Sequence, residues 1–448
     1  MPLDDTVISR LAGVVGEPHI RPGGTADAVD GATPTAVVTP GTAEEIAEVL
    51  RIANAEHFNV IPCGGRTMLA LGRPPDRCDV LLSTRRLQHL LHHSPADLVA
   101  TVETGLTLET LQADLGKNNQ ILPLDPPYAQ SATIGGVLSA NTSGPKRLLY
   151  GGVRDYLLGT RVVRPTGEIV KAGGIVVKNV TGYDMNKLYI GALGTLGIVV
   201  EATFKLHPIP ETEETLLATC PSHDTASACV EAIRNSQLLP AAMTVIDPEA
   251  HTQIADGRVK TSYLFALCAE GVEPIVVRHR SLGTDLLREA GAHDIIVLDA
   301  ETSAPFWEQI RRLPCAEMAV DGGICSATCR SVLPVARGQD LFPLVHRIAR
   351  ENGVKVLTLF HAGHGIGYVR LLTDPDGLAL DHLVRAVVVL REEIVRREGH
   401  LIVESAPLLF KRKVDVWGKM DSRDLVLMRM LRTRFDPRSI VNPVRFVV

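Results

Sequence analysis

Glycine is concentrated in one stretch of this 448-residue chain. Of its 38 glycines, 13 lie between Ser131 and Val200. Clustered glycine marks backbone that takes positive φ or lies against a neighbour that leaves no room for a Cβ. Short apolar runs, rather than Ser or Pro repeats, separate these glycines, so the stretch is not a flexible linker. We expect a folded segment whose main chain lies along a large ligand.

The length of the chain exceeds what one hydrophobic core usually supports, so at least two domains are expected. Hydrophobic residues make up 45% of the chain, and its formal net charge is −5. This acidic balance argues against a nucleic-acid partner. The N-terminus has two early acids and no apolar signal core, and no apolar run is long enough to cross a membrane. The sequence therefore predicts a cytoplasmic protein, with the inner face of the membrane reachable through a partner complex.

The eight cysteines are scattered along the chain and form no CxxC pair. The nearest two, Cys325 and Cys329, lie in an expected strand, where residues four apart share one face. Buried small hydrophobic residues are the favoured interpretation over a metal or iron–sulfur site, and no disulfide framework is expected.

The segment HPIPETEET, near residue 210, separates a glycine-rich half from a half in which helix and strand patterns alternate. Before it we expect short strands, a helix capped by Thr42, and a hairpin across Pro165–Gly167. After it, helices alternate with strands in the manner of an α+β domain with an antiparallel sheet. The expected domains are 1–210 (core about 30–210), 211–415, and a C-terminal helix and tail, 416–448, that returns to the first domain.

Two glycine-containing turns are candidate phosphate sites. The loop IPCGGRTMLALG follows an expected strand, and successive amides near Gly64 and Gly65 can form an anion-binding nest. The turn TIGGVLSANTSG opens a short helix at Gly135 and Gly136. Neither turn matches a Rossmann or P-loop fingerprint, and a purely structural turn explains either one alone equally well. Together they suit a dinucleotide better than a mononucleotide.

These motifs occur in a recognisable order. PCGGRT, LDPP, TIGG, YGGVRD, GTRVVRPTGEIVKAGG, KNVTGYDMNKL and GTLGIV follow one another between about residues 30 and 210. In this order the chain resembles the FAD-binding domain of the vanillyl-alcohol-oxidase (PCMH-type) family, and most of all the FAD-binding E-type subunit of bacterial glycolate oxidase. The C-terminal VDVWG and FDPRSIVNP fit the same family. The implied fold is α+β: a two-lobed FAD-binding domain followed by an α+β cap domain.

The resemblance implies that FAD lies along main chain and is bound non-covalently. The family often links flavin to a His or Cys, but Arg66 or its neighbours stand at the usual His position and Cys63 comes one or two places early. The implied cofactor residues are Cys63, Gly64, Gly65, Arg66, Thr67, Pro126, Thr133, Ile134, Gly135, Gly136, Asn141, Ser143, Gly144, Gly151, Arg154, Asp155, Val180, Gly182, Asp184, Gly197, Ile198 and Val199.

Some of these side chains have an equally good structural interpretation. Arg154 and Asp155 suit a surface ion pair as well as a ligand role. Lys178 and Lys187 suit solvated charges slightly better than flavin contacts.

The run FHAGHGIGY, residues 360–368, raises the question of a metal. On a strand, His361 and His364 would point to opposite faces, and on a turn their geometry does not follow from the sequence. Related D-2-hydroxyacid dehydrogenases carry HxGDGNxH here, and aligned from His361 this chain has His364, Ile366 and Tyr368 in place of the Asp, Asn and second His. Later, Glu404 is retained but Ser405 replaces a His. We therefore expect no metal site, with His361, Glu404 and Arg370 as the candidate catalytic residues.

The resemblance implies an FAD-binding subunit of a glycolate oxidase-type complex. It would relay electrons from 2-hydroxy acid oxidation between a homologous catalytic flavin subunit and an iron–sulfur subunit. One alternative is a self-sufficient FAD-linked oxidase or dehydrogenase of glycolate or D-lactate. Another is a non-catalytic assembly protein of the same fold, which the intact glycine motifs argue against.

Overall fold

The structure is a computed structural model that describes residues 3–175, 183–255, 257–258, 260–315, 325–373 and 378–447. The chain divides into two units. Unit 1 comprises Met1–Ser143, Gly152–Ile209 and Lys419–Val448, and unit 2 comprises Gly144–Gly151 and Pro210–Gly418. Residues 144–151, which the sequence analysis assigns to the FAD-binding half, thus group with the other unit.

Unit 1 begins with a four-stranded sheet in the order β1-β2-β4-β3. Strands β2, β4 and β3 are parallel, and β1 is antiparallel to β2. Helix α2 links β2 to β3, as the capping pattern predicts: the Thr42 hydroxyl accepts from the Glu45 amide at 3.1 Å, and the Glu45 carboxylate accepts from the Gly41 amide at 2.7 Å. The elements are α1 (Asp5–Val15), β1 (Ile20–Pro22), β2 (Ala36–Val38), α2 (Ala43–Glu56), β3 (Val60–Cys63) and β4 (Val80–Ser83).

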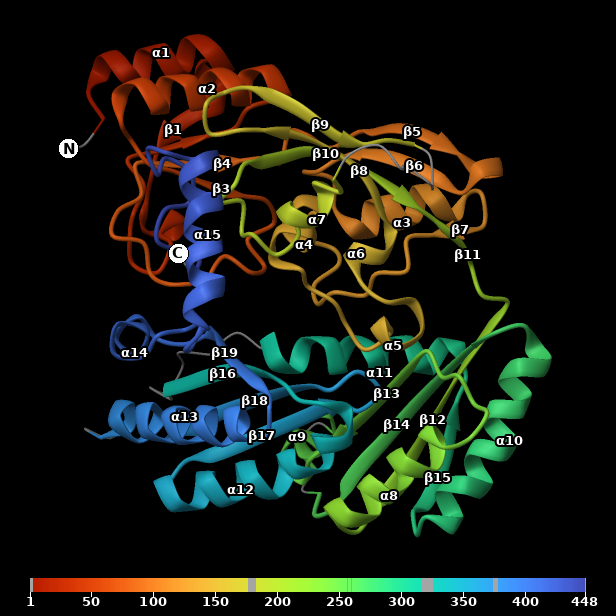
Figure 1. The fold of residues 1–448 in the computed structure, drawn as a ribbon. Coiled ribbons are helices and arrows are strands. Elements are labelled where there is room, and N and C mark those ends of the chain that lie inside the picture. The colour runs from red at the N-terminus through yellow and green to blue at the C-terminus, as the bar shows by residue number, and fades with distance from the viewer. Residues whose placement is uncertain are drawn as a thin grey trace. The chain divides into compact units, whose positions relative to one another are not determined.

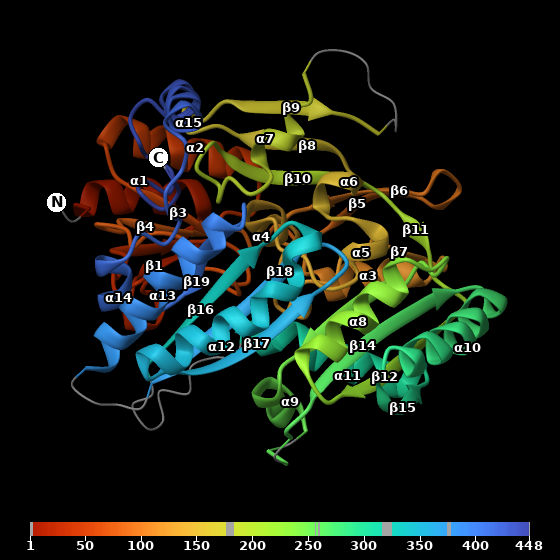
Figure 2. The same ribbon diagram turned by 60° about the horizontal axis from the view of Figure 1, so that its bottom comes forward.

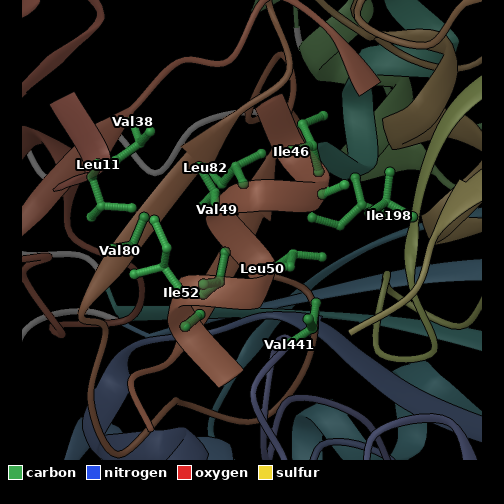
Figure 3. Packing of buried hydrophobic residues seen from close by; sticks show 14 of the residues in the cluster. Leu11, Val38, Ile46, Val49, Leu50, Ile52, Val80, Leu82, Ile198 and Val441 are labelled. Carbon is green, nitrogen blue, oxygen red and sulfur yellow. The ribbon is translucent and has the colours of Figure 1, made fainter. Parts of the chain in front are cut away.

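The core beneath α1 and α2 is built from apolar side chains at helical spacing facing those of the strands. Figure 3 shows Ile46 and Leu50 of α2 among Val80 and Leu82 of β4, with Val441 from the C-terminal tail in the same cluster. Full burial of each such side chain contributes about 1.5–3 kcal/mol. The tail belongs to this core because Val441 forms a parallel bridge with Val60 at the start of β3.

A second sheet of unit 1 is antiparallel, in the order β5-β6-β10-β8-β9. It contains the predicted hairpin, in which β8 and β9 pair across a turn at Pro165–Gly167, where Gly167 has φ +78°. Figure 1 shows both sheets of the unit. The remaining elements of unit 1 are β5 (Leu90–Ser94), β6 (Val99–Glu103), α3 (Leu108–Gly116), β7 (Gln120–Ile121), α4 (Ile134–Ala140), α6 (Val153–Tyr156), β8 (Leu157–Val163), β9 (Ile169–Gly173), α7 (Asn186–Tyr189), β10 (Ile198–Lys205), β11 (His207–Pro208) and α15 (Ser422–Phe435).

Unit 2 is one eight-stranded antiparallel sheet with helices on both faces (Figures 1 and 2). The strand order is β15-β12-β14-β13-β17-β18-β16-β19. Helix α11 packs Trp307 and Ile310 on one face, and α8, α10, α12 and α13 cover the other. This is the predicted α+β arrangement. Its elements are α5 (Arg147–Tyr150), β12 (Thr212–Cys220), α8 (His223–Arg234), β13 (Ala242–Ile246), α9 (Pro248–Ile254), β14 (Tyr263–Gly271), α10 (Glu273–Glu289), β15 (His293–Leu298), α11 (Ala300–Arg312), β16 (Cys325–Val332), α12 (Leu341–Asn352), β17 (Lys355–His361), β18 (Ile366–Thr373), α13 (Ala379–Arg396), β19 (His400–Ser405) and α14 (Leu408–Lys413).

Residues 144–151 are held in unit 2 by a buried ion cluster. The Lys146 ammonium lies 2.7 Å from a Glu213 oxygen and 2.6 Å from a Glu270 oxygen. The side chain of Glu270 is only 3% exposed, so its charge depends on this partner. Next to the cluster, Leu148 packs directly over Gly363, where a Cβ would come within 2.3 Å of the leucine side chain. Among the residues described, no helix combines the length and hydropathy needed to cross a bilayer.

Candidate functional site

Unit 1 contains a cavity of about 810 Å³, measured with its open mouth. The space enclosed by the walls alone is about 110 Å³. Ten residues that the sequence analysis singles out line it: Cys63, Gly64, Gly65, Arg66, Thr67, Thr133, Gly135, Gly136, Ile198 and Val199. The cavity therefore joins the two glycine turns that are 70 residues apart in the chain.

The loop after β3 presents unpaired amides to this cavity. Within the described part of the chain, the amides of residues 64–67 donate to no protein acceptor. Arg66 takes a left-handed conformation with φ +65°, which is typical of the backbone in an anion-binding nest. Unpaired amides on a concave surface are typical of an anion site, so this loop can hold a pyrophosphate as predicted.

Close packing between the two turns explains two of the glycines. A Cβ on Gly65 would lie 1.6 Å from the Ser131 carbonyl oxygen, and one on Gly64 would lie 2.0 Å from the Thr133 hydroxyl. Backbone atoms cannot yield to such overlaps without moving the loop. These glycines are thus required to assemble the cavity wall, whatever they contact inside it.

The turn at Thr133–Gly136 differs from the prediction. Its amides already have acceptors: Ile134 donates to the Leu106 carbonyl at 2.9 Å, Gly135 to the Thr104 carbonyl at 2.8 Å and Gly136 to the Thr133 hydroxyl at 3.2 Å. This turn lines the cavity with small residues, but these amides are not available to a phosphate. Ile134 and Gly135 donate to the neighbouring loop and Gly136 to the helix cap, so the amides that the sequence pattern suggested were free are already used.

Two arginines at the cavity are already paired with carboxylates. Arg66 lies 2.8 Å from Asp27, and Arg21 lies 2.7 Å from the same carboxylate, so the pKa of Asp27 is well below its usual range, mainly through the Arg21 hydrogen bond. Arg445 is 2.6 Å from Asp30 and also donates to the carbonyls of Leu69, Leu71 and Arg73. These guanidinium groups therefore fix loops around the cavity.

Several predicted cofactor residues do not line this cavity. They are Pro126, Ile134, Asn141, Ser143, Gly144, Gly151, Arg154, Asp155, Asp184 and Gly197. Arg154 and Asp155 are exposed, and the Asp155 carboxylate accepts from the Gly152 amide at 2.8 Å rather than pairing with Arg154. Asp184 is paired with Lys187 at 3.0 Å. Val180, Gly182 and Lys178 lie outside the described residues.

Gly144 and Gly151 belong to unit 2, and Gly197 has a packing role. A Cβ at Gly197 would come within 2.8 Å of the Val162 side chain. The lack of a side chain at Gly197 therefore allows β10 to approach β8, independently of any ligand.

Sequence reasoning missed part of the cavity wall. The additional residues are Pro62, Met68, Leu69, Leu71, Thr84, Thr104, Ser139, Ala140, Leu193, Gly194, Asn442 and Arg445. The last two come from the C-terminal tail, and the Asn442 side-chain Nδ2 donates to the Leu193 carbonyl at 2.6 Å. The motif FDPRSIVNP was the available signal, because it marks a tail that ends a helix and returns to the core.

Cys63 lies in the cavity wall as a buried thiol. Burial raises its pKa, and the nearby Arg66 charge only partly opposes this. A neutral thiol is a poor nucleophile, which agrees with the expectation of non-covalent flavin.

Polar side chains of unit 2 gather on the sheet face that carries α11. His361 ends β17, is 3% exposed, and its Nδ1 is 2.9 Å from the Thr244 hydroxyl. Burial lowers the pKa of His361 well below 6.5, so its imidazole is neutral. The ring of Tyr368 stands edge-on to that of His361, with centroids 5.8 Å apart.

The two histidines of the FHAGHGIGY run do not point to opposite faces. His361 ends the strand and His364 lies in the turn that follows, so their ring centroids are only 5.5 Å apart. The strand geometry does not apply to this pair, because the chain turns at residues 361–365, where Gly365 takes φ +74°. The alternation rule applies only within a strand.

Glu404 is paired with a residue that the sequence analysis did not single out. Its carboxylate lies 2.8 Å from the Arg330 guanidinium, and both side chains are largely buried. Burial raises the pKa of Glu404, while Arg330 opposes the rise. Arg330 is in register with Tyr368, and Arg370 follows two residues further along β18 in register with Thr328. The three candidate catalytic residues thus belong to one sheet.

Two family models match the chain. One, described as an FAD binding domain, matches residues 34–173, and one described as the C-terminal domain of FAD linked oxidases matches residues 209–445. Both matches agree with the resemblance drawn from the sequence motifs.

Curated relatives cover nearly the whole chain. Glycolate oxidase subunit GlcD of Bacillus subtilis is 29% identical, covering 92% of this chain and 88% of that protein. D-2-hydroxyglutarate dehydrogenase of Xanthomonas citri pv. viticola is 27% identical, with the same two coverages. Glycolate oxidase subunit GlcE of Escherichia coli is 34% identical, over 37% of this chain and 47% of that protein.

Solved structures share the fold. Alkyldihydroxyacetonephosphate synthase matches with a TM-score of 0.78 at 18% identity, covering 99% of this chain and 86% of that one. p-Cresol methylhydroxylase matches with a TM-score of 0.76 at 17% identity, covering 98% and 96%. At these identities the likeness extends to the fold alone.

FAD fits the cavity of unit 1 on its structural features. The unpaired amides of residues 64–67 suit the pyrophosphate, and Gly135 and Gly136 leave the opposite wall without bulky side chains. Ile198 and Val199 add an apolar wall of the kind that aromatic rings pack against.

Proposed function

Because the chain belongs to the FAD-linked oxidase family, we propose that it is the FAD-binding subunit of a glycolate oxidase-type dehydrogenase of small 2-hydroxy acids. FAD would be held non-covalently in the cavity of unit 1. The observation that carries this proposal is the near full-length likeness to a glycolate oxidase subunit. The cavity supports it, because the loop amides at residues 64–67 have no protein acceptor and can bind an anion.

The proposed partners are a homologous catalytic flavin subunit and an iron–sulfur subunit. In this arrangement the chain relays electrons between them. The relay role is supported by two side chains of unit 2: the Glu404 carboxylate is engaged by Arg330, and Tyr368 stands where the related dehydrogenases have a second histidine.

Oxidation of a 2-hydroxy acid needs a base for the hydroxyl proton and a cation for the carboxylate. The chemistry that FAD supplies when bound is acceptance of a hydride from the carbon that carries the hydroxyl. His361 is the candidate base: Thr244 fixes the ring through Nδ1, and the neutral imidazole can take up a proton at Nε2. Arg370 is the candidate carboxylate partner.

The buried His361–Thr244 pair favours a second candidate, in which the chain oxidises the substrate by itself. The hydrogen bond to Thr244 holds the imidazole in one orientation, and a general base must be held in a fixed position. Both candidates require FAD and differ only in where the substrate is oxidised.

The visible spectrum and anaerobic stopped-flow mixing test these functions. We expect the purified chain to show flavin bands at about 370 and 450 nm, as bound flavins do. On mixing with glycolate or D-lactate, the relay function predicts no bleaching of the isolated chain but full reduction by dithionite. Prompt bleaching that is lost in His361→Gln would establish direct oxidation instead. A chain that purifies without flavin and does not take up added FAD would contradict both, and would favour an assembly role.

A further inference from the structure

A group of three possible metal ligands lies in unit 2, away from the His361 face. Asp247 and Glu249 stand at the start of α9, and His346 lies on α12. Both helices pack against β17. One oxygen of each carboxylate and one imidazole nitrogen lie within 4.8 Å of one another. Elements about 100 residues apart thus bring one nitrogen and two oxygen donors together.

Two atoms of this group are buried without a hydrogen bond. Asp247 is fully buried, and its Oδ1 caps α9 by accepting from the Ala250 amide at 2.8 Å. Its Oδ2 and the His346 Nε2 have no hydrogen-bond partner. The Thr358 hydroxyl is near the carboxylate, but no hydrogen bond of normal geometry joins it to Oδ2. An unsatisfied buried polar atom usually costs about 1–3 kcal/mol, so this arrangement calls for a partner.

The aspartate and the histidine do not satisfy each other. Asp247 Oδ2 lies 3.6 Å from His346 Nε2, beyond normal hydrogen-bond length. Ligands of one zinc ion with bonds of about 2.0–2.2 Å are held about 3.3 Å apart in tetrahedral geometry. The observed separation is therefore closer to that of two ligands facing a shared ion.

We propose that Asp247, Glu249 and His346 bind a divalent transition-metal ion, with Zn²⁺ as the best match. One imidazole nitrogen and two carboxylate oxygens suit zinc, whereas Mg²⁺ and Ca²⁺ favour oxygen ligands alone. Glu249 is exposed, so its side chain is free to move from within 4.8 Å of the other two ligand atoms to coordination distance. Water would complete the coordination.

Aromatic packing holds the histidine in place. The ring of Tyr263 stands edge-on to His346 with centroids 6.4 Å apart, and it also packs edge-on to Phe342 at 5.3 Å. A ligand whose ring is already oriented loses little entropy on binding. A bound ion would connect the start of α9 to α12, and its effect would be to stabilise unit 2, independently of FAD.

Zinc binding to the metal-free full-length chain tests this site. The chain is stripped with a chelator, dialysed, and titrated with ZnCl₂ by calorimetry, and bound metal is counted after dialysis. We expect the wild-type chain to bind one more ion than His346→Gln, with affinity at that site reduced about tenfold or more in Glu249→Gln. Zinc should also raise the Tm of the wild-type chain but not that of His346→Gln.

A matched control separates this site from incidental zinc binding. His293 lies beside Asp294 at 3.0 Å on the edge strand β15 and is half exposed, so His293→Gln removes a comparable histidine outside the group. This variant should bind zinc as the wild type does. Equal stoichiometry and affinity in the wild type and Glu249→Gln would overturn the proposal, and because Glu249 is exposed, that variant remains informative if His346→Gln does not fold.

Discussion

At the scale of single residues, Lys146 neutralises two acidic side chains inside unit 2. Its ammonium is the partner of Glu270, which is almost fully buried, and of Glu213. Glu213 in turn accepts from Ser303 at 2.8 Å, within a chain of hydrogen bonds that ends at Trp307. Burial by itself lowers the pKa of Lys146, but the charges of Glu270 and Glu213 outweigh this effect and raise the pKa overall, so the ammonium stays protonated at neutral pH.

Replacing Lys146 should therefore destabilise unit 2. We expect Lys146→Met to lower the free energy of unfolding by about 3–5 kcal/mol, because it leaves buried carboxylates without a counter-charge. Lys117→Met, which removes an exposed pair with Asp114, should cost about 0–1 kcal/mol. Urea denaturation measures both. Recovery in Lys146→Met combined with Glu213→Gln and Glu270→Gln would identify charge as the cause, and no recovery would point to lost packing.

A second residue-scale prediction concerns pH. Burial lowers the pKa of His364 from 6.5 to about 4, with the Arg147 charge as a further cause. Between these pH values the unfolded imidazole binds a proton and the folded one does not, so stability falls as pH drops from about 6.5 to about 4. Between pH 7 and 4.5, we expect the free energy of unfolding to fall by about 2–3 kcal/mol less in His364→Leu than in the wild type. Urea denaturation at each pH measures this difference. Parallel profiles would contradict the shift.

Single residues also show which parts of the site could be predicted from the sequence and which could not. Gly64, Gly65 and Arg66 could be singled out through the ordered family motifs, whereas the glycine loop alone fits a structural turn equally well. Arg330 and Arg445 were not, because their roles depend on contacts with residues more than 70 positions away. His346 and Asp247 were missed for the same reason.

At the scale of elements, sequence patterns of a few adjacent residues predicted individual helices and hairpins correctly. The Thr42 cap, the β8–β9 hairpin and the helix ending before FDPRSIVNP each depend on a few adjacent residues. The geometry of the two histidines in FHAGHGIGY could not be predicted, because the local pattern fits both a strand and a turn. The order of the eight strands in unit 2 depends on pairings between distant segments, which no local pattern encodes.

The contact between the two glycine turns gives an element-scale prediction. Gly65→Ala should cost about 1–3 kcal/mol or more and abolish FAD binding, because its Cβ would overlap the Ser131 carbonyl. Gly116→Ala is the matched control: nothing lies within 4 Å of its Cβ position at the end of α3, and we expect unchanged or slightly higher stability. Thermal unfolding and the flavin content of each purified variant measure the two effects. Normal flavin content in Gly65→Ala would show that the loop adjusts.

At the scale of the whole molecule, the C-terminal tail makes unit 1 dependent on both ends of the chain. Asp436 accepts from the Ile440 and Val441 amides, each at 2.9 Å, which turns the tail towards β3. Arg445 then fixes the loop at residues 69–73 beside the cavity. The match to the FAD binding domain, residues 34–173, contains the loop but not the tail, which falls in the match to the C-terminal domain of FAD linked oxidases, residues 209–445.

We therefore expect Arg445→Ala to weaken FAD binding, and a chain ending at Phe435 to lose it. The reason is that loop 69–73 would lose its buried guanidinium partner and the cavity would lose part of its wall. Arg438→Ala removes an exposed arginine that donates to one carbonyl, and should retain flavin. Fluorescence titration with FAD measures the affinities. Full flavin retention by the shortened chain would show that the tail is dispensable.

The grouping of residues 144–151 with unit 2 also bears on how such proteins diversify. The chain passes from one unit to the other four times, after residues 143, 151, 209 and 418. A recombination event that exchanged only residues 210–418 would leave the old Lys146 and Leu148 facing a new set of partners. Productive exchange requires either that short loop to travel with its sheet or the sheet to retain the acids that meet it. Because of the eight-residue crossing, an exchange at the single boundary near residue 210 would separate Lys146 and Leu148 from their present partners.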